Sequence, residues 1–146
     1  MIFQIIGAFI AVVAFSVVLE APKKYLVYGG IIGATGWGIY LLIINDVGVV
    51  KANFISALVI ALLSHSFARI RKAPVTVFLI PGIMTLVPGG VMYKAVYSFI
   101  QNDRLSATKY LNETVAIAGM IALAIFVIDS VFRICTKKQW GKLGRH

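Results

Sequence analysis

Apolar runs of roughly twenty residues, separated by short basic loops, constrain this chain more than any other feature. A helix of about 20 apolar residues crosses a hydrocarbon core of about 30 Å. Only 13% of the residues are charged, and the mean hydropathy is +0.94. The sequence therefore predicts an all-α integral membrane protein, a single domain over residues 1–146. We expect five transmembrane helices, approximately at residues 1–19, 25–44, 49–68, 74–100 and 115–135.

Basic residues are distributed unevenly among the connections. The connections after the second and fourth runs hold Lys51, Arg104 and Lys109. The connections after the first, third and fifth runs hold ten basic residues: Lys23, Lys24, Arg69, Arg71, Lys72, Arg133, Lys137, Lys138, Lys142 and Arg145. Because cytoplasmic loops are enriched in lysine and arginine, we expect a multi-pass plasma-membrane protein with its N-terminus outside and its C-terminus in the cytoplasm. Basic clusters between apolar runs favour anionic lipid headgroups over nucleic acid as partners.

The fourth apolar run is interrupted by the stretch PGIMTLVPGG, residues 81–90. Pro81 and Pro88 each remove a backbone donor from a helix. Ile80 and Val87 each precede a proline and are expected to leave the α region. The sequence therefore predicts a fourth transmembrane helix that is broken between Pro81 and Gly90.

Three glycines, Gly82, Gly89 and Gly90, are expected to give this break the backbone freedom for a sharp bend. Irregular backbone at membrane depth is tolerated only inside protein or along a wet cavity, so such a break is typical of a transport site. A structural kink without a ligand is the alternative. A re-entrant hairpin is a second alternative, disfavoured because it would place the basic tail outside.

Polar groups near the break indicate what a site there would bind. A helix beginning near Gly89 points free N–H groups and its positive dipole end into the membrane, which suits a carboxylate. Thr85 supplies a hydroxyl and Lys94 a charge, although Lys94 can instead extend its amine to the membrane surface. We expect a small organic anion or zwitterion as substrate, bound by Pro81, Gly82, Thr85, Pro88, Gly89, Gly90, Lys94 and Asn53.

The other runs carry features that packing explains. Small and weakly polar residues recur on one face of the third run and predict a buried face: Asn53, Ser56, Ala57, Ala61, Ser64 and Ala68. Gly29, Gly33 and Gly36 predict a seam of close helix packing in the second run. His65 is interpreted as a satisfied interfacial histidine, with proton coupling as the alternative.

Three local features lie toward the C-terminal end. Asp129 and Arg133 are spaced for a local ion pair. Residues 101–112 are expected to form a polar connection, and Trp140 is expected to anchor the tail at the membrane surface.

Catalytic chemistry is not indicated. The chain has one cysteine and two histidines, and it contains no carboxylate pair, metal-ligand cluster or nucleotide-phosphate loop. We therefore expect neither enzyme activity nor a cofactor, and a membrane-embedded enzyme subunit is disfavoured.

Two motifs, APVTVFLIPGIMTLVPGG at residues 73–90 and APKKYLVYGGIIGATGW at residues 21–37, carry a family resemblance. Across about residues 21–135 the chain resembles the threonine/serine exporter family, and more narrowly the short split subunit that corresponds to its C-terminal membrane domain. The family often has proline where this chain has Thr85. The resemblance implies a small subunit of a secondary transporter that exports carboxylate-bearing solutes, threonine and serine or a dicarboxylate such as succinate. It also implies a larger membrane subunit as partner.

The sequence leaves open whether the chain forms a homo-oligomer and whether it has a transport site. Seams of small residues also allow a homo-oligomer. The alternative function is a structural or assembly membrane protein without a transport site.

Overall fold

Helices account for nearly all of the part of the chain that the structure describes. The structure is a computed structural model that describes residues 1–143, with side chains to Cys135. The predicted anchor Trp140 therefore has its side chain outside the described part. The helices are α1 (Ile2–Val18), η1 (Lys23–Tyr25), α2 (Leu26–Val47), α3 (Val49–Arg71), α4 (Thr76–Ile83), η2 (Met84–Leu86), α5 (Gly89–Ile100) and α6 (Arg104–Leu143).

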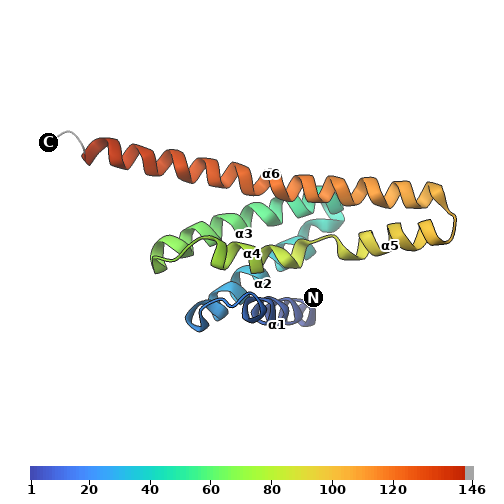
Figure 1. Ribbon diagram of the computed structural model, residues 1–146, viewed down its shortest axis with the longest axis horizontal. Helices are drawn as coiled ribbons and strands as arrows, with labels where there is room; N and C mark the ends of the chain where they lie inside the picture. Colours follow the sequence, from blue (N-terminus) through green and yellow to red (C-terminus); the bar gives the residue numbers. More distant parts are fainter. Residues whose placement is uncertain (144–146) are drawn as a thin grey trace.

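The helices form a three-helix block with a long hairpin along one side (Figure 1). The first three helices α1, α2 and α3 pack in sequence order, and α4 lies against α2 and α3. The longest helix, α6, packs on α3 with one half and on α5 with the other. The α5–α6 hairpin therefore extends beyond the end of the block, as the right side of Figure 1 shows.

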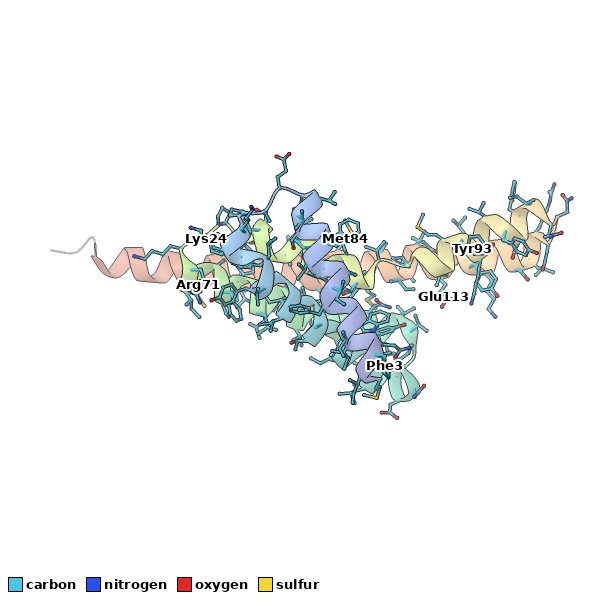
Figure 2. The ribbon with its side chains drawn as sticks, turned by 90° about the horizontal axis from the view of Figure 1, so that it is seen from below. Phe3, Lys24, Arg71, Met84, Tyr93 and Glu113 are labelled. Carbon is cyan, nitrogen blue, oxygen red and sulfur yellow. The ribbon has the colours of Figure 1, made fainter. Side chains whose placement is uncertain are left out.

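The ends with most of the positive charge lie together. The connections after α1 and after α3 are on the left of Figure 1, on the same side as the C-terminal end of α6. Figure 2 shows Lys24 beside Arg71 at this end, with Phe3 near the opposite end of the block. A guanidinium N–H of Arg71 donates to the Tyr28 hydroxyl, which joins α3 to the start of α2. The fold thus collects the cationic connections on one side, as a charge-based topology requires.

Small residues let the block pack closely. The six residues of the predicted small face of α3 are all buried, which confirms that prediction. A Cβ at Gly33 would lie 2.4 Å from Val12 of α1, and a Cβ at Gly36 would lie 2.3 Å from Ile60 of α3. The glycine seam is therefore confirmed at these two positions, and α2 is held between α1 and α3.

Three helices, α1, α3 and α5, end in the same way. Glu20, Lys72 and Asn102 adopt left-handed φ values of 55°, 50° and 60°. The next amide in each case donates to the carbonyl five residues earlier, as Ala73 does to Ala68 at 3.0 Å. This is the hydrogen-bond pattern of a Schellman helix end.

The helices support three or four of the five predicted membrane crossings. Within the described residues, three segments are long and apolar enough to cross a membrane: Lys23–Val47, Val49–Arg71 and Arg104–Cys135. The bent pair Thr76–Leu86 and Gly89–Ile100 is a fourth candidate, with 46° between its halves. The apolar helix Ile2–Val18 has 17 residues and is shorter. The fold is thus all-helical with three to four candidate spans.

The polar connection predicted at residues 101–112 is wrong for most of its length, because α6 begins at Arg104. Asp103 starts this helix by accepting the Ser106 amide at 3.1 Å, which satisfies an N–H that would otherwise have no partner. Packing against α5 then supports the first turns of α6. The connection is reduced to three residues.

The break is also shorter than predicted. Pro81 lies inside α4, and Ile80 before it is helical. Gly82, Gly89 and Gly90 are helical as well, and the positive φ among the described glycines belongs to Gly48. The buried packing of Pro81 and Gly82 keeps this segment helical despite the missing N–H, since neighbouring helices stabilise a proline within a membrane helix.

Candidate functional site

The bend is made by two residues, Val87 and Pro88. Val87 is extended, with φ −59° and ψ 128°, and Pro88 has φ −77° and ψ 48°. A proline ring disfavours the α region for the preceding residue, and Val87 leaves that region as predicted. The two halves that meet here are bent by 46°.

The N-terminus of α5 opens at this bend without a side-chain cap. Its hydrogen-bond ladder begins with the Met92 amide, which donates to the Pro88 carbonyl at 2.9 Å. The amides of Gly90 and Val91 lie in the first turn of α5, before the first intrahelical hydrogen bond. The N–H groups at such positions have no acceptor within the helix. The positive end of the helix dipole adds to these donors. The arrangement can therefore accept hydrogen-bonding anionic groups.

A cavity of about 280 Å³ lies at this end of α5. Its walls come from α2, α3, the bend, α5 and α6. It is lined by Trp37, Tyr40, Val49, Asn53, Thr85, Leu86, Val87, Pro88, Gly90, Val91, Lys94 and Ile117. We call it the break cavity. It brings together five of the eight residues predicted for the substrate site: Asn53, Thr85, Pro88, Gly90 and Lys94.

Polar side chains around the break cavity keep hydrogen-bonding capacity. Thr85 donates its hydroxyl to the Gly82 carbonyl at 3.0 Å, which leaves its oxygen as an acceptor. Asn53 donates one amide hydrogen to the Val49 carbonyl at 2.9 Å, and its amide group has a second hydrogen. The amine of Lys94 lies 5.8 Å from the centre of the Tyr110 ring. Donors, an acceptor and one cation are thus available to a small polar solute.

The other three predicted residues lie elsewhere. Pro81 lines a separate cavity with residues of α4 and of the α1–α2 connection. Gly82 packs into the block, where an added Cβ would lie 3.1 Å from Ile60 and 3.4 Å from Ile32. Gly89 does not line the break cavity, and a Cβ there would meet nothing within 4 Å. Pro81 and Gly82 therefore shape the packing behind the site.

Two aromatic residues of α2 line the break cavity and were missed by the sequence reasoning. Trp37 and Tyr40 stack with ring centres 4.9 Å apart. Their spacing of three residues, which puts them on one face, was the available signal. The glycines of the same helix predicted only a packing seam.

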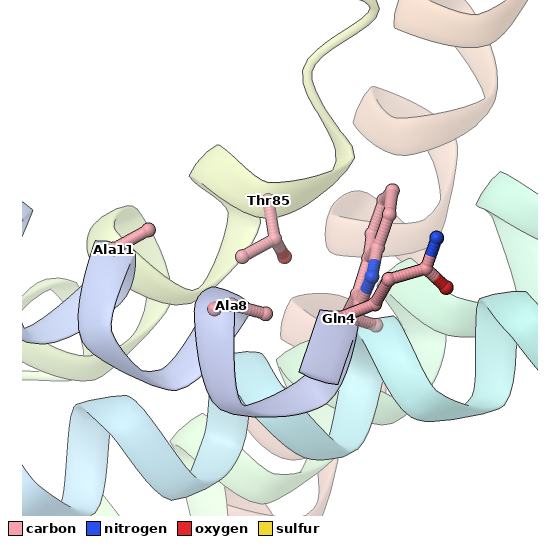
Figure 3. A pocket seen from close by; sticks show the side chains of 6 residues that line it. Gln4, Ala8, Ala11 and Thr85 are labelled. Atoms are coloured by element: carbon pink, nitrogen blue, oxygen red, sulfur yellow. The ribbon is translucent and has the colours of Figure 1, made fainter. Parts of the chain in front are cut away.

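A second cavity of about 290 Å³ lies on the α1 side of Thr85. It is lined by Gln4, Gly7, Ala8, Ala11, Trp37 and Thr85. Figure 3 shows Ala8 of α1 opposite Thr85, with Gln4 and Ala11 on either side of Ala8 along the same helix. Trp37 and Thr85 are common to both cavities, so they form the partition between them.

Comparison with known proteins agrees with this architecture. The family described as "Threonine/Serine exporter, ThrE" matches residues 4–131. A protein of Corynebacterium glutamicum named "Threonine/serine exporter" is 26% identical over 125 residues, which are 86% of this chain and 25% of that protein. The chain therefore spans about a quarter of the length of this relative. No solved structure matches. Because the family match extends over most of its length, this chain belongs to the threonine/serine exporter family.

Proposed function

We propose that the chain is the small membrane subunit of a secondary exporter for carboxylate-bearing solutes. The substrates are threonine and serine or a dicarboxylate such as succinate, and the break cavity is the substrate site. The observation that carries the proposal is the cavity itself, which gathers a helix N-terminus, Thr85, Asn53 and Lys94 at one place.

The chemistry of the cavity favours a carboxylate. Amides at the start of α5 and the positive helix end attract an anion. Lys94 adds a full positive charge, and a hydrogen bond to a charged group contributes roughly 1.5–3 kcal/mol. Thr85 and Asn53 can accept from or donate to the amino or hydroxyl group of the same solute.

The size of the cavity favours a small molecule. Its volume of about 280 Å³ lies at the lower limit of ligand pockets, roughly 300–1,000 Å³. Amino acids and short dicarboxylates are solutes of this class.

A larger partner subunit and the topology belong to the same proposal. The chain covers 25% of the exporter from Corynebacterium glutamicum, and a larger membrane subunit of the same family is its proposed partner. Five crossings, with the N-terminus outside and the C-terminus in the cytoplasm, agree with the cationic ends that the fold collects on one side. The short α1 is then the first crossing.

The test compares Lys94→Gln with Lys51→Gln, a control at an exposed position on the first turn of α3. Both variants are expressed at matched membrane abundance with the proteins that copurify from the native membrane. Loss of one charged hydrogen bond should lower substrate affinity about 10- to 150-fold in Lys94→Gln and leave Lys51→Gln near wild type. Equal transport by the two variants would show that Lys94 is a surface anchor and contradict its place in the site. Absence of transport by the wild-type assembly would favour the structural or assembly function.

A further inference from the structure

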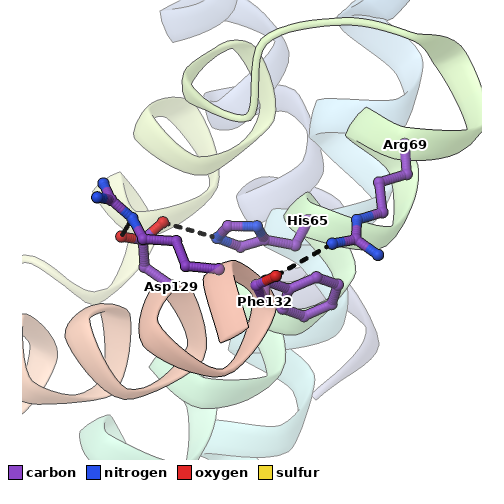
Figure 4. Close-up of polar contacts among 5 residues, drawn as sticks. His65, Arg69, Asp129 and Phe132 are labelled. Atoms are coloured by element: carbon purple, nitrogen blue, oxygen red, sulfur yellow. Dashed lines mark hydrogen bonds and ion pairs between the residues drawn. The ribbon is translucent and has the colours of Figure 1, made fainter. Parts of the chain in front are cut away.

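A cluster of ionisable side chains lies between α3 and α6, away from the break cavity (Figure 4). His65 of α3 is 8% exposed, and its Nε2 lies 3.8 Å from Oδ1 of Asp129 on α6. Oδ2 of Asp129 lies 2.7 Å from Nε of Arg133. The imidazole stacks on Phe132 with ring centres 4.6 Å apart. One carboxylate is therefore placed between a buried histidine and an arginine.

The surroundings of His65 make this arrangement unusual for a packing contact. Both helices are candidate membrane spans, and ionisable groups inside spans are costly and usually functional. In the described part of the chain, the charged groups that act on His65 are Asp129 on α6 and Arg69 one turn along α3, and Arg133 pairs with Asp129. The Arg69 guanidinium lies over the Phe132 ring at 4.7 Å and donates to the Phe132 carbonyl. Two arginines and one carboxylate thus set the charge that the imidazole experiences.

The distance between His65 and Asp129 fits a contact that depends on protonation. At 3.8 Å the two groups are too far apart for a hydrogen bond. A neutral imidazole therefore leaves Asp129 paired with Arg133, whereas an imidazolium attracts the carboxylate and draws α6 toward α3. The event is the addition of one proton to an imidazole nitrogen, and it raises the charge of the cluster by one.

The same two helices form walls of the break cavity at their other halves. Asn53 lies 12 residues before His65 on α3, and Ile117 lies 12 residues before Asp129 on α6. At 1.5 Å per residue, each separation is about 18 Å. Because α3 and α6 are continuous helices over these lengths, a change in their spacing at His65 alters the spacing of two cavity walls.

We propose that His65 and Asp129 form a protonation site that sets the spacing of α3 and α6 and so couples proton binding to the opening of the break cavity. Proton binding holds the two helices together, and proton release separates them. The proposal rests on the proposed function, since it assigns the regulation of that cavity.

The first test measures proton binding without transport. The chain has two histidines, so His146→Ala leaves His65 as the one imidazole. Its titration is followed by NMR in the complete assembly, with ¹⁵N-labelled histidine in this chain alone. Removing the carboxylate in Asp129→Asn should lower the proton affinity of His65 by at least about sixfold, the Coulomb value for 3.8 Å in water. The control Asp103→Asn, at the far end of α6, should leave it unchanged. The proposal would be overturned if the titration midpoint of His65 were the same with and without the Asp129→Asn substitution. It would also be overturned if His65 did not titrate between pH 4 and 9.

The second test separates proton coupling from transport itself. Liposomes carrying the complete assembly are assayed for exchange of labelled against unlabelled threonine, and for threonine movement driven by a pH gradient. His65→Gln should keep the exchange at near the wild-type rate and lose most of the acceleration by the gradient. A wild-type response to the gradient in His65→Gln, or loss of both activities, would overturn the proposal. Absence of exchange by the wild-type assembly would instead contradict the proposed function, and the NMR titration would then decide the protonation site alone.

Discussion

Substitution of Gly36 by alanine tests how α2 is held against α3. A Cβ at Gly36 would lie 2.3 Å from both Cδ1 and Cγ1 of Ile60. Ile60 is fully buried, so any movement of its side chain must displace the residues packed around it. Its branched side chain also has a stiff χ1 angle in a helix. The added methyl group must therefore push the two helices apart.

The expected cost follows from the overpacking of a tight core. Insertion of an extra methyl group into such a site destabilises a protein by about 1–3 kcal/mol. A shift of one to two kcal/mol changes the ratio of folded to unfolded protein by about 5- to 30-fold. Where there is no clash, replacing glycine by alanine stabilises a helix by roughly 0.5–1 kcal/mol. The measured decrease in the free energy of unfolding is therefore the steric cost minus this gain.

The assay is reversible unfolding of the detergent-solubilised protein, with Gly119→Ala as the control. Gly119 is on α6, and a Cβ there would meet nothing within 4 Å. Gly119→Ala should therefore be neutral or slightly stabilising, while Gly36→Ala is destabilising. Ile60→Ala removes both clashing atoms, and the double variant should show a coupling of at least about 1 kcal/mol in a double-mutant cycle.

The reasoning fails if Gly36→Ala is as stable as Gly119→Ala. It also fails if Ile60→Ala and Gly36→Ala act additively, because the clash requires the isoleucine atoms.

Two further predictions concern the bend and the start of α6. Pro88→Ala restores a backbone N–H and releases the preceding residue to the α region, so the 46° bend between α4 and α5 should decrease. Pro81→Ala should leave it unchanged, and spin-label distances between α4 and α5 measure both. Hydrogen bonds from the Ser106 side chain and backbone hold the pKa of Asp103 below its ordinary value. The ionised carboxylate of Asp103 therefore caps the start of α6 above about pH 4. This cap is lost as the pH falls through the lowered pKa and the carboxylate is protonated. Asp103→Ala, which removes the cap acceptor, should thus increase amide exchange in the first turn of α6 at neutral pH, with no difference at strongly acid pH.

Much of the helical architecture is predictable from the sequence because long apolar runs and faces of small residues reflect strong physical constraints. The small face of α3 is buried as predicted, and Asp129 and Arg133 form the predicted pair. Local rules failed where packing opposes them. Pro81 stays helical because it is buried against neighbouring helices, and the polar residues after Asp103 become helical because α6 lies along α5.

The residues of the candidate site were predictable only in part. The prolines and glycines indicated a break, and five of the eight residues chosen from it and its neighbourhood line the break cavity. The aromatic wall formed by Trp37 and Tyr40 was not found, since its position depends on how α2 packs against the bend. A sequence pattern on one helix carries no information about which neighbour covers its face.

If the break cavity opens as proposed, the packing indicates which part of the molecule would move. Close contacts at Gly33 and Gly36 join α1, α2 and α3 into one unit. By contrast, α5 packs chiefly against α6, and this hairpin extends beyond the block (Figure 1). Packed interfaces move as units, because a dense interior resists gradual deformation. The boundary between the block and the hairpin passes through the break cavity at one end and through His65 and Asp129 at the other. A small shift of α6 along this boundary would therefore change the cavity and the ionisable cluster together, while the tight contacts between α1, α2 and α3 stay intact.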